Sequence, residues 1–447
     1  MWFDDTIFAP ASAAGKAAVA LVRVSGGAAG GALRRLTGDA PLPEPRRATL
    51  RAIREPESGQ EIDRAMVLWF PAPASYTGED VAEFHVHGGR AVIAALLRAL
   101  GGMDGLRPAE AGEFSRRAFE YGKLDLTAAE GIADLIEAET EIQRRQALRQ
   151  SEGALGALYE GWRGRLLVIR ALLESTIDFS DQELPDGVLD PVAPQVRDIA
   201  GEIEAHLADD HWGERLRDGV QVAILGPVNS GKSSLINRLA GRDAAIVAPQ
   251  AGTTRDIVEV RLDIAGWPLT VADTAGLRAA EGAVEAEGIR RARARGEVAD
   301  LNIVMLDGAR WPEGVEEAEK LADERAIFVL NKSDLLDRDA PGAHIGGREA
   351  LNISCKTGEG LDELLAKLRE NLEERHLFSA APLPTRGRHR HALEKCLESL
   401  HRYDIDAGQE LAAEDLRLAA DSLGRITGRV DIEQVLDIIF KEFCIGK

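Results

Sequence analysis

The sequence predicts a multidomain protein. We expect an α/β or α+β domain at the N-terminus, then an all-α region, and a second α/β domain inserted into that all-α region. The chain has 447 residues, more than the about 100 to 200 residues of a single domain. Its hydrophobic pattern changes near Leu126 from short apolar runs to helical spacing, and short apolar runs return at Val220. The expected segments are residues 1–120, 121–216, 217–378 and 379–447.

Short apolar runs within residues 1–120 indicate buried strands. The runs Ala18–Val24 and Ala65–Phe70 are rich in apolar and β-branched residues, and glycine or proline bounds them. Turn and helix signals separate these runs. We therefore expect the first domain to be α/β or α+β.

A third run, Val81–His87, carries polar residues at alternate positions. The strand period places Glu83, His85 and His87 on one face and apolar residues on the other. A glutamate and two histidines on one face could bind a metal ion, but the sequence supplies no evident fourth ligand. Ordinary polar alternation on a solvent-facing strand explains the pattern equally well.

The helical segments flank a region of different character. Ile132, Leu135 and Ile136 recur at the i, i+3 and i+4 spacing of an amphipathic helix. Apolar residues after Pro384 do the same. Between the two segments, continuous apolar runs alternate with helix signals, as in a parallel sheet that is covered on both faces. Domain termini often lie close together, so this region can be inserted into one helical domain.

Charge and cysteine content exclude several classes of protein. Lys plus Arg is 54, Asp plus Glu is 75, and the net charge is -21. A chain this acidic is not a non-specific binder of nucleic acid or anionic membranes, so any RNA contact must use local basic patches. The 3 cysteines favour a reducing compartment over a disulfide framework. No apolar run reaches the roughly 18 residues of a membrane span, so we expect a cytoplasmic protein without a membrane partner.

The inserted region opens with a phosphate-binding motif. Gly226–Ser233 has the pattern G-x-x-x-x-G-K-S and follows the apolar run Val220–Leu225. Its glycines let the backbone wrap a phosphate chain, Lys232 supplies positive charge, and the Ser233 hydroxyl can bind Mg²⁺. The alternative is an incidental glycine turn between a strand and a helix. A strand before the motif and a helix after it favour the phosphate site.

Four further motifs follow in the order expected of a Ras-like P-loop GTPase domain. They are Gly252–Asp256, Asp273–Gly276, Asn331–Asp334 and Ser354–Lys356. The Asp273 carboxylate is placed to hold Mg²⁺ through its water shell. Asp334 can accept two hydrogen bonds from guanine, which adenine does not supply. The residues expected to contact GTP are Asn229, Ser230, Gly231, Lys232, Ser233, Ser234, Thr253, Thr254, Asp273, Thr274, Ala275, Gly276, Asn331, Lys332, Asp334, Ser354, Cys355 and Lys356.

The residue that positions the attacking water is left open by these motifs. Ras-like GTPases use a glutamine after D-x-x-G, but Leu277 occupies that position and has no hydrogen-bonding group. Glu281, Glu285 and Glu287 are the nearby candidates. They are equally explained as the acidic first turn of the next helix.

The motifs together resemble the MnmE (TrmE) family of tRNA modification GTPases over the whole chain. The resemblance rests on the P-loop, G-T-T-R-D, D-T-A-G-L-R and N-K-S-D motifs, on Ser75–Asp80, and above all on the C-terminal Cys444–Lys447. It implies an N-terminal tetrahydrofolate-binding domain that dimerises, an all-α helical domain made of two chain segments, and an inserted G domain. With a flavoprotein of the MnmG (GidA) type, such proteins add a carboxymethylaminomethyl or aminomethyl group to C5 of the wobble uridine of certain tRNAs.

The same resemblance assigns roles within the G domain. Glu285 matches the residue that positions water. Ser233 and Thr254 match the Mg²⁺ ligands. A K⁺ ion that bridges two G domains is expected at Asn229, Ala248, Gln250 and Thr253. One departure bears on the K⁺ loop, because the usual proline precedes that asparagine directly and here Pro227 lies one place earlier.

The resemblance also implies a site for 5-formyltetrahydrofolate or a related reduced folate. Its residues are Arg23, Glu83, Lys123 and Lys447, and Cys444 would lie nearby as a functional thiol. The cations suit a folate carboxylate, and Glu83 suits the N–H groups of a pterin. A second departure is that Gly15–Ala18 stands at the family's glycine-rich turn near this pocket. Cys444 is otherwise explained as an inert buried thiol.

Two other functions share some of these features. A ribosome-assembly GTPase would have the same G motifs, together with an RNA-binding appendage. A folate-dependent one-carbon transferase regulated by GTP would share the first domain and work without tRNA. The arginines near residues 290 and 386–390 suit tRNA phosphates, but such clusters are more often solvated or paired with acids.

Overall fold

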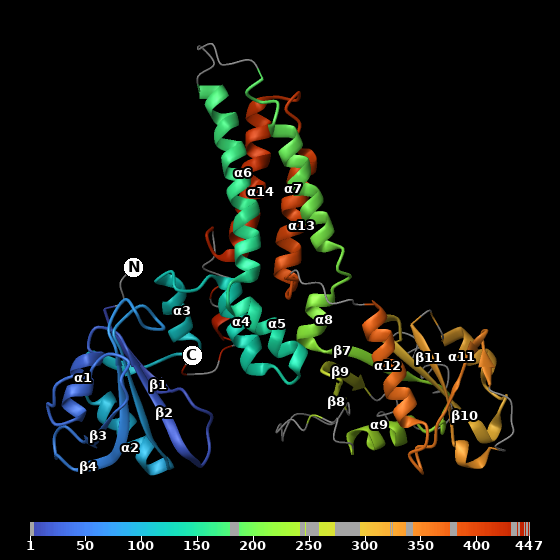
Figure 1. Ribbon diagram of the computed structural model, residues 1–447, viewed down its shortest axis with the longest axis horizontal. Coiled ribbons are helices and arrows are strands. Elements are labelled where there is room, and N and C mark those ends of the chain that lie inside the picture. The colour runs from blue at the N-terminus through green and yellow to red at the C-terminus, as the bar shows by residue number, and fades with distance from the viewer. Residues whose placement is uncertain are drawn as a thin grey trace, which may run out of the picture. The chain divides into compact units, whose positions relative to one another are not determined.

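The computed structural model describes most of the chain, which divides into two compact units. One unit comprises Met1–Ala133, Gln150–Ile199 and Ala392–Lys447, and the other comprises Asp134–Arg149 and Ala200–His391. The units thus alternate along the sequence (Figure 1). The described residues are 4–178, 187–241, 246, 259–272, 296–321, 323, 325–336, 343–375, 382–430, 436, 439–441, 443 and 446.

The N-terminal part of the first unit is an α+β domain built on a six-stranded sheet, as the sequence predicts. The strand order is β3-β4-β5-β2-β1-β6. The β1–β6 pair is parallel, and the other pairs are antiparallel. Two helices cover one face of this sheet (Figure 1). The elements are β1 Thr6–Pro10, β2 Ala17–Ser25, α1 Ala29–Leu36, β3 Thr49–Arg54, β4 Glu61–Phe70, β5 Val81–Gly88, α2 Arg90–Gly101 and β6 Leu106–Pro108.

Alternation along the strands decides which side chains meet the helices. On β5, Ala82, Phe84 and Val86 are buried in the core under the helices. Glu83 and His85, between them, are partly exposed on the other face. The predicted two-sided pattern of this strand is therefore confirmed.

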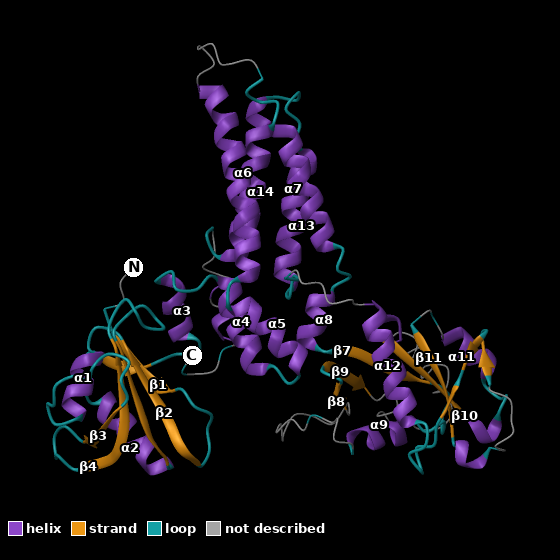
Figure 2. Ribbon diagram, viewed as in Figure 1, coloured by secondary structure: helices purple, strands orange, loops and turns teal. Residues whose placement is uncertain are grey.

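Helices follow the sheet, as predicted after Leu126. Helix α6 packs along α14, although the two lie far apart in the sequence (Figure 2). The Thr176 hydroxyl on α6 contacts Gln409 Oε1 on α14 at 3.1 Å. Helices from both predicted segments thus share one core. Among the helices of the described ranges, none is long and apolar enough to cross a bilayer. The helices are α3 Glu113–Glu120, α4 Leu126–Glu137, α5 Glu141–Ser151, α6 Ala154–Asp178, α7 Val192–Leu207, α13 Gly387–Arg402 and α14 Gln409–Thr427.

The second unit is built on another six-stranded sheet, with the order β14-β11-β10-β7-β9-β8. Its central strands β10 and β11 are buried on both faces, because a hydrophobic core lies on each side of the sheet. The elements are α8 Trp212–Asp218, β7 Val220–Leu225, α9 Lys232–Ala240, β8 Glu259–Ile264, β9 Trp267–Ala272, β10 Leu301–Asp307, η1 Gly308–Arg310, α11 Val315–Leu321, β11 Ala326–Asn331, η2 Ser333–Leu335, β12 His344–Ile345, β13 Arg348–Glu349, β14 Leu351–Asn352 and α12 Leu361–Arg375.

One edge of this sheet departs from the predicted parallel arrangement. Strand β8 runs antiparallel to β9, whereas the other pairs of the sheet are parallel. The cause is a two-residue turn at Ala265 and Gly266, whose φ values are 52° and 92°. Positive φ at both positions is typical of the tight hairpin turn that joins antiparallel strands.

Candidate functional site

The glycine-rich loop, Gly226–Ser233, begins directly after β7 and runs into the first turn of α9. It forms one side of the candidate nucleotide site. Gly226 and Gly231 have φ values of 137° and 105°. A Cβ on Gly226 would lie 2.1 Å from the Met305 carbonyl oxygen, and one on Gly231 would lie 2.1 Å from Asn331 Nδ2. Only glycine fits at these two close approaches. The predicted phosphate loop therefore has the required backbone shape.

The Lys232 ammonium is bound by backbone carbonyl groups of the same loop. Lys232 Nζ donates to the carbonyl oxygens of Gly226 and Pro227, at 2.8 and 2.7 Å. Helix α9 begins at Lys232, so the positive end of its dipole faces the same loop. Ser233 is exposed in the first turn of this helix. The arrangement gathers positive potential where a phosphate would bind.

Asn331 joins three of the predicted motifs. Its Nδ2 donates to the Ser230 carbonyl at 2.8 Å, and its Oδ1 accepts from the Cys355 N–H at 3.1 Å. The residue is 3% exposed. The side chain therefore fixes the glycine-rich loop against the N-K-S-D and S-C-K motifs.

The predicted guanine-reading carboxylate is also held in place. Ser354 Oγ donates to Asp334 Oδ1 at 2.7 Å, and Lys356 Nζ lies 3.8 Å from Oδ2. The Ser333 N–H donates to the Ile353 carbonyl at 2.9 Å, which joins the two loops through their backbones. Burial raises the pKa of the Cys355 thiol to about 11, against the opposing charge of Arg238. Cys355 is thus a neutral thiol at physiological pH.

Several predicted residues lie outside the described residues, but the strands beside them are described. Strand β9 pairs in parallel with β7, with Ala272 opposite Ala223. The carboxyl ends of β7 and β9 therefore lie at the same edge of the sheet, and the glycine-rich loop begins at this edge. The predicted residues outside the described part are Ala248, Gln250, Thr253, Thr254, Asp273, Thr274, Ala275, Gly276, Leu277, Glu281, Glu285, Glu287, Cys444 and Lys447.

Sequence reasoning missed one carboxylate at this edge. Asp307 ends β10, and its Oδ2 lies 2.6 Å from Lys332 Nζ. Its position at the end of an apolar run is the one signal in the sequence, and Asp273 has the same position. Asp307 belongs to none of the five motifs, so the sequence does not single it out.

The first unit brings two of the predicted folate residues together. Arg23 and Glu83 are opposite each other on β2 and β5. Arg23 Nε and Nη2 lie 3.0 and 2.9 Å from Glu83 Oε1. The guanidinium carbon lies 5.3 Å from the Tyr76 ring centroid and 5.7 Å from that of Phe114. The ion pair therefore lies on the sheet face opposite α1 and α2, with the Arg23 guanidinium near two aromatic rings.

Two further contacts bear on the same prediction. A Cβ on Gly78 would lie 3.5 Å from Lys123 Cε, so the lysine side chain lies beside this residue of the predicted Ser75–Asp80 motif. A Cβ on Gly446 would lie 2.1 Å from the Pro10 carbonyl oxygen. The residue before Lys447 thus packs against the end of β1.

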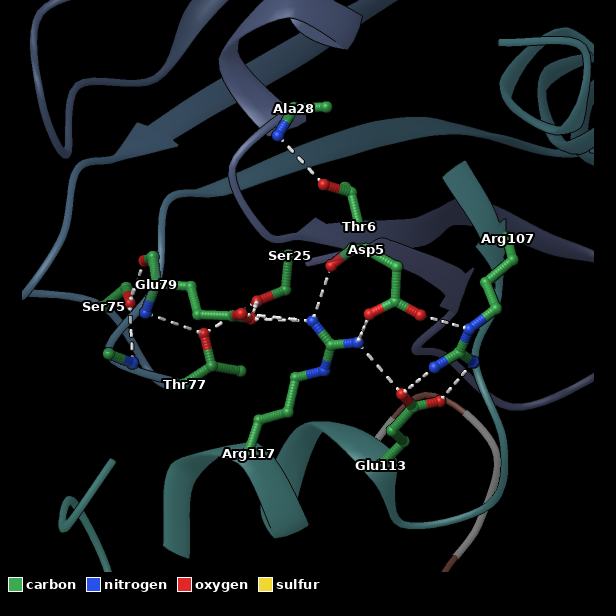
Figure 3. A network of polar contacts seen from close by, with 11 residues as sticks. Asp5, Thr6, Ser25, Ala28, Ser75, Thr77, Glu79, Arg107, Glu113 and Arg117 are labelled. Carbon is green, nitrogen blue, oxygen red and sulfur yellow. Dashed lines mark hydrogen bonds and ion pairs between the residues drawn. The ribbon is translucent and has the colours of Figure 1, made fainter. Parts of the chain in front are cut away.

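A buried arginine anchors the Ser75–Asp80 loop (Figure 3). Arg117, on α3, is fully buried. It donates to Glu79 Oε1 at 3.1 Å, Asp5 Oδ1 at 2.7 Å and Glu113 Oε1 at 3.1 Å. Burial would raise the pKa of Glu113, but hydrogen bonds from Arg107, the Glu110 N–H and Arg117 outweigh it and lower that pKa. The network joins the N-terminus, this loop and α3 into one rigid support.

The metal alternative on β5 is not favoured by these contacts. Glu83 is paired with Arg23, and His87 Nδ1 lies 2.8 Å from Asp63 Oδ1. Within the described ranges, no group of three or more His, Cys, Asp or Glu side chains is placed to hold a metal ion. The ion pair with Arg23 and the hydrogen bond with Asp63 therefore account for the polar side chains at Glu83 and His87.

The basic cluster at residues 386–390 is largely neutralised. Arg386 Nη2 lies 2.7 Å from Asp134 Oδ1, and Arg390 Nη2 pairs with Asp209. The side chains of these arginines are 16% and 10% exposed. Arg386 and Arg390 thus have acidic partners within their own unit.

Known proteins resemble this chain over almost its whole length. Family models described as the MnmE helical domain and the N-terminus of the GTP-binding protein TrmE match residues 126–444 and 6–123. The tRNA modification GTPase MnmE of Paramagnetospirillum magneticum is 56% identical over 444 residues, which cover 99% of this chain and 100% of that protein. Its namesake in Parvibaculum lavamentivorans is 56% identical over 447 residues, with the same coverage. The mitochondrial 5-taurinomethyluridine-[tRNA] synthase subunit GTPB3 of Homo sapiens is 49% identical over 465 residues, covering 99% of this chain and 93% of that protein.

Proposed function

Because this chain belongs to the MnmE family of tRNA modification GTPases, we propose that it modifies the wobble uridine of certain tRNAs together with a flavin-dependent partner. It is a GTPase that acts in tRNA modification. The proposed product carries a carboxymethylaminomethyl or aminomethyl group on C5 of the uridine. GTP hydrolysis would drive association of two G domains and a conformational change.

One observation carries the nucleotide half of this proposal: Asn331 fixes the glycine-rich loop and the two base-binding motifs to one another. The phosphates of GTP would lie on the glycine-rich loop, under the N–H groups at the start of α9. Asp334 would accept the N1–H and amino hydrogen bonds of guanine. A carboxylate that accepts both hydrogen bonds rejects a base that lacks those donors, which gives selectivity for GTP.

The hydrolysis step needs charge stabilisation and a positioned water. We assign Mg²⁺ to Ser233 and Thr254, and K⁺ to Asn229, Ala248, Gln250 and Thr253. Asn229 supports the K⁺ assignment because it is exposed on the glycine-rich loop, with a φ of 66°. When bound, these cations would neutralise negative charge that develops on the phosphates. Glu285 would orient the attacking water, because Leu277 has no group to do so.

The first unit would hold the one-carbon donor, 5-formyltetrahydrofolate or a related reduced folate. Arg23, Lys123 and Lys447 would meet its carboxylates, and Glu83 would accept from the pterin. The Arg23–Glu83 pair supports this assignment because it brings a cation and a carboxylate together on one face of the sheet, beside the Tyr76 ring. Cys444 would lie near this pocket as a functional thiol.

The proposed assembly is a homodimer that binds tRNA and a flavoprotein of the MnmG (GidA) type in the cytoplasm. The few cysteines support a reducing compartment. We divide the chain into a folate-binding and dimerisation domain at 1–120, helical segments at 121–216 and 379–447, and a G domain at 217–378.

Mass spectrometry of wobble uridines tests the proposal. A strain that lacks this protein should lose the C5 group on a subset of tRNAs, and a plasmid copy of the wild type should restore it. An Asp334→Asn copy should restore little, because the GTPase step is impaired. Unchanged wobble uridines in the deletion strain, with accumulation of ribosomal precursors, would instead support the ribosome-assembly function.

A further inference from the structure

The loop after β10 touches two of the nucleotide motifs. A Cβ on Gly308 would lie 2.7 Å from the Asn331 carbonyl oxygen. A Cβ on Gly314 would lie 3.3 Å from Pro227 Cγ. The loop is thus pressed against the N-K-S-D motif at one end and the glycine-rich loop at the other. Close packing at both ends therefore positions this loop beside the two motifs.

Asp307 is the last residue of β10, directly before this loop, and its carboxylate points to the N-K-S-D motif. It lies opposite Asn331 in the parallel register of β10 and β11. Its Oδ2 lies 2.6 Å from Lys332 Nζ, and its Oδ1 accepts from the Ala309 N–H at 3.0 Å. The Asp307 side chain is 14% exposed. Each carboxylate oxygen therefore has a separate partner.

Lys332 needs such a partner because of where it lies. It falls between Asn331 and Asp334, and its φ is 66°, a conformation that non-glycine residues seldom adopt. A long ammonium side chain at this position has many rotamers, and another carboxylate, that of Asp334, borders the same site. An ammonium that bound Asp334 would occupy the acceptor that guanine needs. Lys356 Nζ already lies 3.8 Å from Asp334 Oδ2.

We propose that Asp307 is a positioning residue for guanine recognition: it holds the Lys332 ammonium and so keeps the Asp334 carboxylate available to the base. This inference rests on the proposed role of the site in binding GTP. Asp307 acts through Lys332 and does not itself read the nucleotide. Because the contact lies on the base side of the site, it affects GDP and GTP alike.

The informative substitution is Asp307→Asn in the full-length protein. Asparagine keeps an oxygen that can accept from the Ala309 N–H, and it removes only the charge that holds Lys332. We expect affinity for fluorescent GDP and GTP analogues to fall by about tenfold, the loss of one charge-assisted hydrogen bond. The kcat for GTP hydrolysis should stay close to wild type. Asp307→Glu, which keeps the carboxylate, should recover most of the affinity.

A double-mutant cycle separates positioning from loop stability. In a Lys332→Met background, Asp307→Asn should weaken nucleotide binding no further, because the residue through which it acts is gone. Glu313→Gln is the matched control, since this exposed carboxylate of the same loop lies 3.9 Å from Arg310. It should bind nucleotide like the wild type.

Three results would overturn the inference: wild-type affinity in Asp307→Asn, losses that multiply in the double mutant, or no recovery in Asp307→Glu. Thermal unfolding without nucleotide identifies a variant that has lost its fold, and the Asp307→Glu comparison then decides the question. If the wild type itself bound no guanine nucleotide, the proposed function would fail, and not this inference alone.

Discussion

The side chain of Asn331 donates a 2.8 Å hydrogen bond to the carbonyl oxygen of Ser230, 101 residues earlier in the chain. The other end of the same amide accepts from the Cys355 N–H at 3.1 Å. The oxygen and the nitrogen of this amide thus each have a hydrogen-bond partner, as expected for a residue that is only 3% exposed. One side chain sets the spacing between the phosphate-binding loop and the base-binding loops.

Asn331→Ala should therefore weaken nucleotide binding by at least about tenfold. The substitution leaves the Ser230 carbonyl and the Cys355 N–H without this partner, and each unsatisfied buried group costs about 1–3 kcal/mol. Asn302→Ala is a matched control: this buried amide on β10 donates to the Gly296 carbonyl at 3.1 Å. It should lower the melting temperature more than the affinity. Titration with a fluorescent GDP analogue measures the affinity of both variants. Wild-type affinity in Asn331→Ala would refute the bridging role.

Asp334→Asn should lower GTP affinity by a few kcal/mol and make xanthosine triphosphate the better ligand. The amide presents a donor where guanine also presents donors, and xanthine supplies an acceptor there instead. Lys356→Ala should have a small effect, because the Lys356 side chain is 83% exposed and its nitrogen lies 3.8 Å from the carboxylate. Competition between the two triphosphates measures the switch. Equal GTP affinity in wild type and Asp334→Asn would remove Asp334 from the base site.

Local pattern predicted much of this fold and of the nucleotide site. The strand Val220–Leu225 and the loop Gly226–Ser233 were predictable because apolar runs and glycine spacing are local signals, and the structure places both as expected. The role of the Asp307 carboxylate was not predictable, because its partner is fixed by the register between β10 and β11. The Arg117 network was not predictable either. It joins residues as distant as Asp5 and Glu113, and no periodicity links them.

GTP hydrolysis should be fast in KCl and slow in NaCl at equal ionic strength. The expected reason is that K⁺ at Asn229 neutralises charge between the β- and γ-phosphates, while the smaller ion fits the same ligands poorly. Asn229→Ala should hydrolyse GTP slowly in both salts and bind GDP almost normally. Phosphate release at saturating GTP is the measurement. Equal wild-type rates in the two salts would leave a GTPase without a K⁺ requirement.

Arg117→Met should destabilise the first unit by about 3–5 kcal/mol, because removing one partner of a buried ion network leaves uncompensated charge. Hydrogen exchange in peptides that cover Glu113–Glu120 measures the loss locally. Arg116→Met is the control, since this neighbour on the same helix is 40% exposed and pairs with Glu120. Unchanged protection in Arg117→Met would show that the network contributes little to stability.

The same network predicts the sign of a pH dependence. The pKa values of Asp5 and Glu113 are lowered from 3.8 and 4.5, because hydrogen bonds from the arginines outweigh the opposing effect of burial. Carboxylates with lowered pKa values stabilise the fold fully above their unfolded values, and this contribution disappears as pH falls through the folded ones. The wild type should therefore lose protection in these peptides below about pH 4.5, and Arg117→Met should lose less on the same acidification.

Removal of Cys444–Lys447 should weaken binding of 5-formyltetrahydrofolate and spare GTP turnover. An acidic chain needs local cations to hold an anionic cofactor, and Lys447 would add one beside Arg23. The contact between Gly446 and the Pro10 carbonyl makes this testable without removing charge. A Cβ cannot be accommodated there, so Gly446→Ala should displace the last residue and lower folate affinity in the same direction.

Isothermal titration of 5-formyltetrahydrofolate into each variant, beside a GTPase assay in KCl, completes the test. Arg23→Ala should lose at least about tenfold in affinity, because it removes a charge-assisted contact. Arg64→Ala is the control, since this β4 arginine is 74% exposed and pairs with Glu61. Unchanged folate affinity in both tail variants would show that the C-terminus is dispensable for this pocket. Loss of GTP turnover with unchanged folate binding would mean that the tail acts in GTP hydrolysis and not in folate binding. We do not expect this result, because the described nucleotide motifs all lie within Ala200–His391.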